Sequence, residues 1–218
     1  MNFNKKFNNT EKEDKASDEV LLSEITAAFD RPELRVTGIY GDVTEDKCSE
    51  VVYGLLALKE TGRRYVKEDP DDEESGMLET YEPIDFYIST FGGHASEMFA
   101  VYDLIRDLSK TVDIRTHGLG KVMSAGVLLL ASGKKGERRI GRNCRVMLHG
   151  VVSGQQGHIA DMENEFTETK MTQKLYISAL SKETKMEEKY IRKLMSKKTN
   201  VYIDAKEAVK LGIADIIF

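Results

Sequence analysis

The sequence lacks three features: many cysteines, a long hydrophobic run and an excess of positive charge. With only two cysteines, Cys48 and Cys144, it cannot build a disulfide framework or a structural zinc site, so we expect a reducing compartment and no metal. The longest apolar stretch, Gly126 to Ala131, is far shorter than the roughly 18 residues of a membrane-spanning helix, so we expect no membrane span. The formal net charge of −5 argues against nucleic acid as the main partner, because no basic field would neutralise phosphates.

The N-terminal segment is polar and mixes lysine with acidic residues, unlike a secretory signal or a transit peptide. We therefore expect residues 1–30 to be mobile, apart from an amphipathic stretch over 19–29, and the protein to be cytoplasmic. Residues 31–218 are long enough for one domain with a full core. The composition, 40% hydrophobic and 32% charged, is ordinary for a globular protein.

Strand-like and helix-like segments alternate from Arg35 to the C-terminus, which predicts an α/β fold with a largely parallel sheet. Strands are expected at 35–41, 84–89, 112–116 (ending at Gly118 and Gly120) and 144–149. Helices are expected from 44, capped by Thr44, to 58, and over 95–108, 124–132, 159–180, 187–195 and 205–211.

Residues 61–82 interrupt this alternation with Gly62, Pro70, Gly76 and the acidic run Glu68–Glu74. The pattern predicts a surface loop inserted into the domain. A solvated charge run explains it most simply, since blocks of like charge are usually disordered, and a docking or gating element is the alternative.

Two glycine-rich turns each lead from a strand into a helix, at 90–93 and 118–126. Such turns present free backbone N–H groups at a helix N-terminus, so a pair of them could form an oxyanion hole beside the Ser124 hydroxyl. His149 ends an apolar strand, and functional groups in parallel sheets collect at the carboxyl ends of strands. Alone, Ser124 could be a helix cap and His149 a structural histidine, and the G-x-S-x-G motif is absent.

Four collinear segments resemble the proteolytic subunit of the Clp protease family: Tyr87-Ile-Ser-Thr-Phe-Gly-Gly93, Gly120-Lys-Val-Met-Ser-Ala-Gly126, Arg145-Val-Met-Leu-His149 and 205–215. The resemblance runs from about Arg35 to the C-terminus and includes the spacing between the serine and the histidine. It implies a ClpP/crotonase-like fold of stacked β-sheets with flanking helices and a protruding handle helix, over about 150–180.

The resemblance also implies roles for particular residues. Ser124 corresponds to the nucleophile, His149 to the general base, and the backbone N–H groups of Gly93 and Ala125 to the oxyanion hole. The glycine-rich segment that contains Gly150, Val151, Val152 and Gly154 resembles the strand that binds an extended substrate through main-chain hydrogen bonds.

The third position of the triad departs from the family, which usually has Asp where this chain has Asn200. Asparagine can orient a histidine but cannot stabilise the imidazolium by charge. We expect Asn200 to orient His149, with a simple turn residue as the alternative. Asp204 is expected instead to cap the following helix. Thr199 replaces an arginine that often precedes the family's aspartate, so an intersubunit charge contact is in doubt.

The surface that receives the ATPase loop in relatives also differs. Tyr87 matches one aromatic position, but Asp85 and Asp107 stand where apolar contacts are expected, with Phe218 a candidate replacement. If the aspartates are unpaired, burying them is costly and an apolar loop would bind poorly. Phe91 also replaces the proline that usually precedes the two glycines.

The resemblance implies a serine endopeptidase, the core of an ATP-dependent protease that cleaves unfolded polypeptides inside a homo-oligomeric chamber of two seven-membered rings. No P-loop motif is present, so we expect no cofactor in this chain and an AAA+ Clp-type unfoldase as the partner that uses ATP. The alternatives are an inactive structural subunit of a mixed ring, an ATPase-independent maturation protease of the phage type, and a crotonase acting on acyl-CoA. The pair Ser124 and His149 disfavours the first and last.

Overall fold

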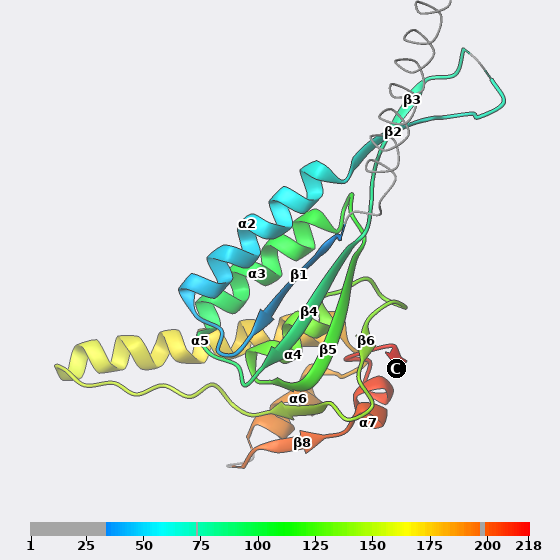
Figure 1. Ribbon diagram of the computed structural model, residues 1–218. Helices are drawn as coiled ribbons and strands as arrows, with labels where there is room; N and C mark the ends of the chain where they lie inside the picture. The colour runs from blue at the N-terminus through cyan, green and yellow to red at the C-terminus, as the bar shows by residue number, and fades with distance from the viewer. Residues whose placement is uncertain (1–33, 73, 197–198) are drawn as a thin grey trace, which may run out of the picture. The chain divides into compact units, whose positions relative to one another are not determined.

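The computed structural model describes residues 34–72, 74–196 and 199–218, and the residues from Arg35 to Phe218 form one compact unit (Figure 1). The expectations for residues 1–30, including the helix over 19–29, lie outside the described residues. The α/β class and the mainly parallel sheet are confirmed.

Three neighbouring strands of the sheet are parallel, β1 (Val36–Tyr40) at one edge, then β4 (Ile84–Thr90) and β5 (Ile114–Met123). The expected end of β5 at Gly118 is wrong, since the strand continues to Met123. A Cβ at Gly118 would lie 3.0 Å from Val122 and 3.1 Å from Leu130, so this glycine allows close packing within the strand. The consequence is that β5 carries the chain directly to Ser124.

The sheet branches along β5, because its two halves pair with different strands. β6 (Arg139–Ile140) pairs with His117 and Gly118, and β7 (Arg145–Leu148) pairs with the last three residues of β5. β9 (Ile216–Ile217) extends the first branch in parallel and β8 (Val201–Ile203) extends the second in the antiparallel direction. The second branch therefore holds the carboxyl ends of β5 and β7 side by side.

The expected helices from Glu45 onward are present, with bounds that shift by a few residues. α4 is buried along its whole length, as its apolar sequence requires. Thr44 occupies the N-cap position of α2, but its side chain makes no capping hydrogen bond, so that expectation is wrong. The bounds are α2 (Glu45–Thr61), α3 (Ala95–Leu108), α4 (Ala125–Ala131), α5 (Ile159–Glu183), α6 (Glu188–Met195) and α7 (Ala205–Lys210).

The acidic insertion is a β-hairpin rather than a loop without regular structure. β2 (Arg63–Lys67) and β3 (Met77–Tyr81) pair antiparallel, and the acidic residues form the connection between them (Figure 1). The side chain of Arg35, 8% exposed, fixes the base of the hairpin through bonds to the carbonyl groups of Leu58 and Pro83. Hydrogen bonds between the two strands stabilise the hairpin despite its polar composition. Strand propensity alone does not predict this pairing.

The segment before α5 and the first half of that helix extend away from the core (Figure 1). Ile159 is 72% exposed and Phe166 59% exposed, whereas the helix becomes buried from Tyr176 onward. This region corresponds to the handle that the resemblance implies. These apolar side chains are largely exposed in this one chain, although Nζ of Lys170 lies 4.1 Å from the centre of the Phe166 ring.

Candidate active site

Ser124 lies at the sharp turn between β5 and α4 and adopts a strained backbone conformation. It is the one non-glycine residue among those described with a positive φ, at 53°. Such conformations persist only where the surroundings fix them. Here the N–H of Ser124 donates to the Met147 carbonyl at 2.8 Å, and its carbonyl accepts from the Tyr176 hydroxyl at 2.9 Å. The turn therefore holds the hydroxyl in one place at the sheet edge.

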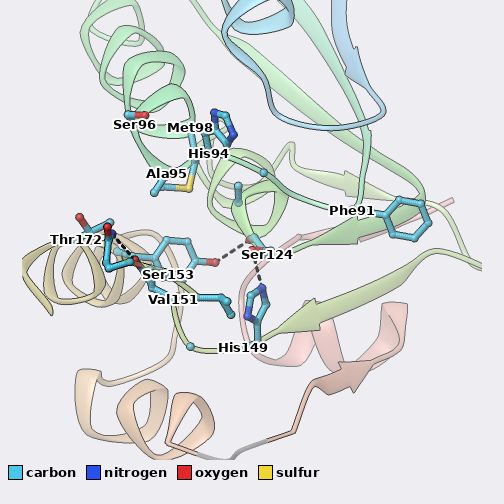
Figure 2. A pocket seen from close by; sticks show the side chains of 16 residues that line it. Phe91, His94, Ala95, Ser96, Met98, Ser124, His149, Val151, Ser153 and Thr172 are labelled. Atoms are coloured by element: carbon cyan, nitrogen blue, oxygen red, sulfur yellow. Dashed lines mark hydrogen bonds between the residues drawn. The ribbon is translucent and has the colours of Figure 1, made fainter. Parts of the chain in front are cut away.

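The serine and the histidine meet as the sequence predicts. Nε2 of His149 lies 2.9 Å from Oγ of Ser124, which is a hydrogen-bond distance (Figure 2). The register pairs Met123 of β5 with Met147 of β7, so the residues that follow these parallel strands emerge at the same edge. The geometry suits transfer of the hydroxyl proton to the imidazole.

The two residues of the expected oxyanion hole line the same cavity as Ser124. Gly93 and Ala125 both line this cavity, which has a volume of about 700 Å³. Within the described residues, neither N–H donates to a backbone carbonyl. Ala125 is the first residue of α4, whose N–H has no intrahelical acceptor, so both amides are available to an anionic oxygen.

The glycines beside these amides are required by close approach. A Cβ at Gly92, where φ is 106°, would lie 2.5 Å from the Cβ of Ser124. A Cβ at Gly93, where φ is 154°, would overlap the carbonyl oxygen of Val43. Val43 also binds both sides of this turn, donating to the Gly92 carbonyl and accepting from the His94 N–H. Only glycine lets the turn approach the nucleophile so closely.

The segment expected to bind substrate forms one wall of the cavity in an extended conformation. Gly150, Val151 and Val152 line the cavity, whereas Gly154 is not among the lining residues. The segment belongs to no strand, so its backbone can pair with a peptide. It is anchored where the Val151 N–H donates to Oε1 of Gln173 at 3.1 Å.

Asn200 lies next to the site but makes no hydrogen bond with His149 in the part of the chain that the structure describes. The antiparallel register pairs Leu148 with Val201, so extending it by one residue puts Asn200 opposite His149. Asn200 is exposed and does not line the cavity. Its role as the orienting residue stays a prediction. By contrast, Asp204 accepts from the Glu207 N–H at 2.9 Å, so its expected role as a helix cap is confirmed.

Comparison with known proteins decides the family. The sequence model described as Clp protease matches residues 77–218. This chain belongs to the Clp protease family.

Curated Clp protease relatives agree with this assignment. ATP-dependent Clp protease proteolytic subunit 1 of Corynebacterium glutamicum is 31% identical over 146 residues, which cover 65% of this chain and 68% of the relative. The protein of the same description from Corynebacterium diphtheriae is 32% identical over 146 residues, again 65% and 68%. ATP-dependent Clp protease proteolytic subunit 3 of Nocardia farcinica is 31% identical over 147 residues, 65% of each chain. The family match begins at Met77, so β2 precedes the matched part.

The Clp protease site includes two residues that the sequence did not single out. Tyr176 was expected only as an apolar position of the long helix, yet its hydroxyl fixes the Ser124 carbonyl, and burial raises its pKa. Gln173 anchors the segment that is expected to bind substrate, by accepting from the Val151 N–H. The one signal in the sequence is that both lie on the same helix, three residues apart, which puts them on one face.

At the surface where Clp protease relatives are expected to receive an ATPase loop, the structure corrects one premise. Asp85 is paired, because its Oδ1 lies 2.7 Å from Nε2 of His117, whose ring stacks on Tyr87 at 4.4 Å. Asp107 is exposed and bonds Lys110, and that hydrogen bond lowers the pKa of its carboxyl group. The surface is therefore polar, and both carboxylates have hydrogen-bond partners.

Among the described residues, no group of three or more His, Cys, Asp or Glu side chains could hold a metal ion. Cys48 and Cys144 are free and buried, and burial raises the pKa of each thiol to about 11. No helix in the described ranges is long and apolar enough to cross a membrane.

Proposed function

We propose that this chain is a serine endopeptidase of the Clp type, with Ser124 as nucleophile and His149 as general base. The observation that carries the proposal is the 2.9 Å contact between these side chains, beside two backbone amides that line the same cavity. Oγ of Ser124 attacks the peptide carbonyl while Nε2 of His149 takes its proton. The N–H groups of Gly93 and Ala125 stabilise the negative charge that develops on the carbonyl oxygen.

The same groups complete the reaction. His149 gives the proton to the leaving amine, the peptide bond breaks, and an acyl ester remains on Ser124. A water molecule that transfers its proton to His149 then attacks the ester and releases the acid. Asn200, opposite His149 in the extended strand register, is proposed to hold the imidazole in the tautomer that accepts the proton.

Labelling with a fluorophosphonate probe tests this directly. We expect one covalent adduct, mapped to Ser124 by peptide mass spectrometry, together with hydrolysis of fluorogenic peptides. Ser124→Ala should abolish both. Ser96→Ala is the matched control, since Ser96 lines the same cavity but bonds only Glu97. Labelling that persists in Ser124→Ala would exclude Ser124 as the nucleophile.

We propose further that the chain works as a homo-oligomer of two stacked seven-membered rings in the cytoplasm. The exposed apolar side chains of α5, such as Ile159 and Phe166, support self-association, because apolar patches of this kind mark interaction surfaces. Native mass spectrometry gives the copy number. A monomer at micromolar concentration would exclude the rings.

An AAA+ unfoldase is proposed to deliver unfolded polypeptides to this chamber. The support is the family, whose curated members carry the description "ATP-dependent". The polar surface at Asp85 and His117 suits a docking loop with polar side chains better than an apolar one. Degradation of an unfolded protein that is slow alone and accelerated by ATP with the unfoldase supports the partnership, and equal rates with and without it would support an ATPase-independent protease.

A further inference from the structure

An exposed aromatic ring lies at the rim of the active-site cavity. Phe91 follows β4 and is 61% exposed. Figure 2 shows it on the opposite side of Ser124 and His149 from Ser153 and Thr172, which lie at the other end of the cavity. A peptide whose scissile bond lies at Ser124 therefore runs toward Phe91 with one half and toward Ser153 with the other.

A cation is held against this ring. Nζ of Lys121 lies 4.6 Å from the centre of the Phe91 ring, which is a cation–π distance. Lys121 lies on β5, three residues before the nucleophile, and it is paired in register with Arg145 of β7. Side chains in register on neighbouring parallel strands share a face, so two positive charges lie together beside the site.

These charges are not neutralised within the described residues, where no carboxylate lies within ion-pair distance of Lys121 or Arg145. The nearest acidic residue by register is Asp204, which would follow opposite Arg145 but accepts the Glu207 N–H. The residues lining the cavity include no Asp, Glu, Lys or Arg. A positive charge therefore lies at the Phe91 end of the cavity, whereas the carboxylate of Glu97, which accepts from the Ser96 hydroxyl, lies beside a different part of the lining (Figure 2).

We propose that Phe91 and Lys121, supported by Arg145, form a subsite that selects an acidic side chain in the first or second residue after the scissile bond. This inference rests on the proposed peptidase function. The other end of the cavity, where the lining residues include no Asp, Glu, Lys or Arg, takes the side chain of the acyl half. The leaving half crosses Phe91, where Lys121 meets a glutamate or aspartate carboxylate.

The expected preference is modest, because the subsite is open to solvent. An exposed ion pair contributes about 0.2–1 kcal/mol, which corresponds to a factor of about 1.4 to 5 in kcat/KM. Two neighbouring cations raise the expectation to about fivefold for glutamate over glutamine. Inverting the charge at Lys121 should reverse the order.

The experiment measures kcat/KM for matched peptides that carry Glu, Gln or Lys at the first and second positions after the scissile bond. Cleavage sites are confirmed by mass spectrometry, and a second set carries the same changes on the acyl side. We expect wild type to prefer Glu over Gln by about fivefold, Lys121→Gln to lose this preference, and Lys121→Glu to prefer Lys. Arg139→Gln is the control and should leave the preference intact. Cζ of Arg139 lies 4.9 Å from the centre of the Phe218 ring, and Arg139 does not line the active-site cavity.

A measurement on the wild-type protein guards against variants that fail to fold. Raising the salt from about 0.05 M to 1 M shortens the Debye length to about 3 Å, so the Glu preference should fall toward 1. A charge-independent rate in wild type, or a charge effect confined to the acyl half, would overturn the subsite. Absence of both hydrolysis and fluorophosphonate labelling would instead overturn the proposed peptidase function, so the two failures are distinguishable.

Discussion

The Ser124 turn and Asn200, which lie on either side of His149, differ in the hydrogen bonds that hold them in place. On one side, the Ser124 N–H donates to the Met147 carbonyl, the Ser124 carbonyl accepts from the Tyr176 hydroxyl, and Gly92 packs against the turn. On the other side, Asn200 is exposed and makes no hydrogen bond with His149 within the described residues. The Ser124 hydroxyl is therefore held in place by contacts within a single chain, whereas no hydrogen bond among the described residues fixes the His149 ring from the Asn200 side.

The largest effect on activity should come from replacing His149, which lies between the Ser124 turn and Asn200. We expect His149→Ala to lower kcat for a fluorogenic peptide by about 10⁴-fold or more, because Ser124 loses its general base. KM should change far less than kcat. His158→Ala is a matched control, since His158 lies outside the cavity. Near-normal turnover by His149→Ala would refute the mechanism.

Gly92→Ala should disrupt the Ser124 turn. The added methyl group would lie 2.5 Å from the Cβ of Ser124, at a φ of 106° that alanine rarely adopts. We expect about a hundredfold loss of kcat/KM, since displacing a reacting group by about 1 Å costs that much. Gly141→Ala is the control, because Gly141 lies outside the cavity and a Cβ there would meet its nearest neighbour only at 3.5 Å, an ordinary contact. Equal activity of the two variants would show that the close approach does not matter.

Asn200→Asp tests whether the residue opposite His149 contributes to catalysis. A carboxylate opposite His149 would stabilise the imidazolium, so we expect the rate of peptide cleavage to change by more than about tenfold. Thr199→Ala, one residue earlier and also exposed, is the control. An unchanged rate in Asn200→Asp would remove this residue from the mechanism.

The smallest effect should follow Tyr176→Phe, which deletes the hydroxyl that donates to the Ser124 carbonyl. The Ser124 carbonyl keeps its bond from the Val127 N–H at 3.0 Å, so the turn remains closed. We expect a loss of about 1 kcal/mol in the free energy of unfolding and a drop in kcat of only a few fold. Chemical denaturation and steady-state kinetics measure these. A loss as large as that of Gly92→Ala would mean that Tyr176 has a direct role in catalysis.

Much of the site could be predicted before any coordinates. The strand ending at His149, the turn carrying Ser124 and the helix cap at Asp204 follow from local apolar patterns and capping chemistry. The hairpin over residues 61–82 could not, because its strands are stabilised by each other and by Arg35, which lies far earlier in the chain. The pairing of Asp85 with His117 was missed for the same reason, since the two residues are 32 positions apart.

The sequence by itself determined the alternation of strands and helices and the glycines that the turns need, because these depend on neighbours along the chain. Its resemblance to the Clp protease family indicated the candidate nucleophile and base. Only the tertiary structure decided that β5 continues to Ser124, that Tyr176 and Gln173 support the site, and that Phe91 and Lys121 stand at its rim. Those outcomes depend on contacts between segments brought together by the branched sheet, which no local pattern encodes.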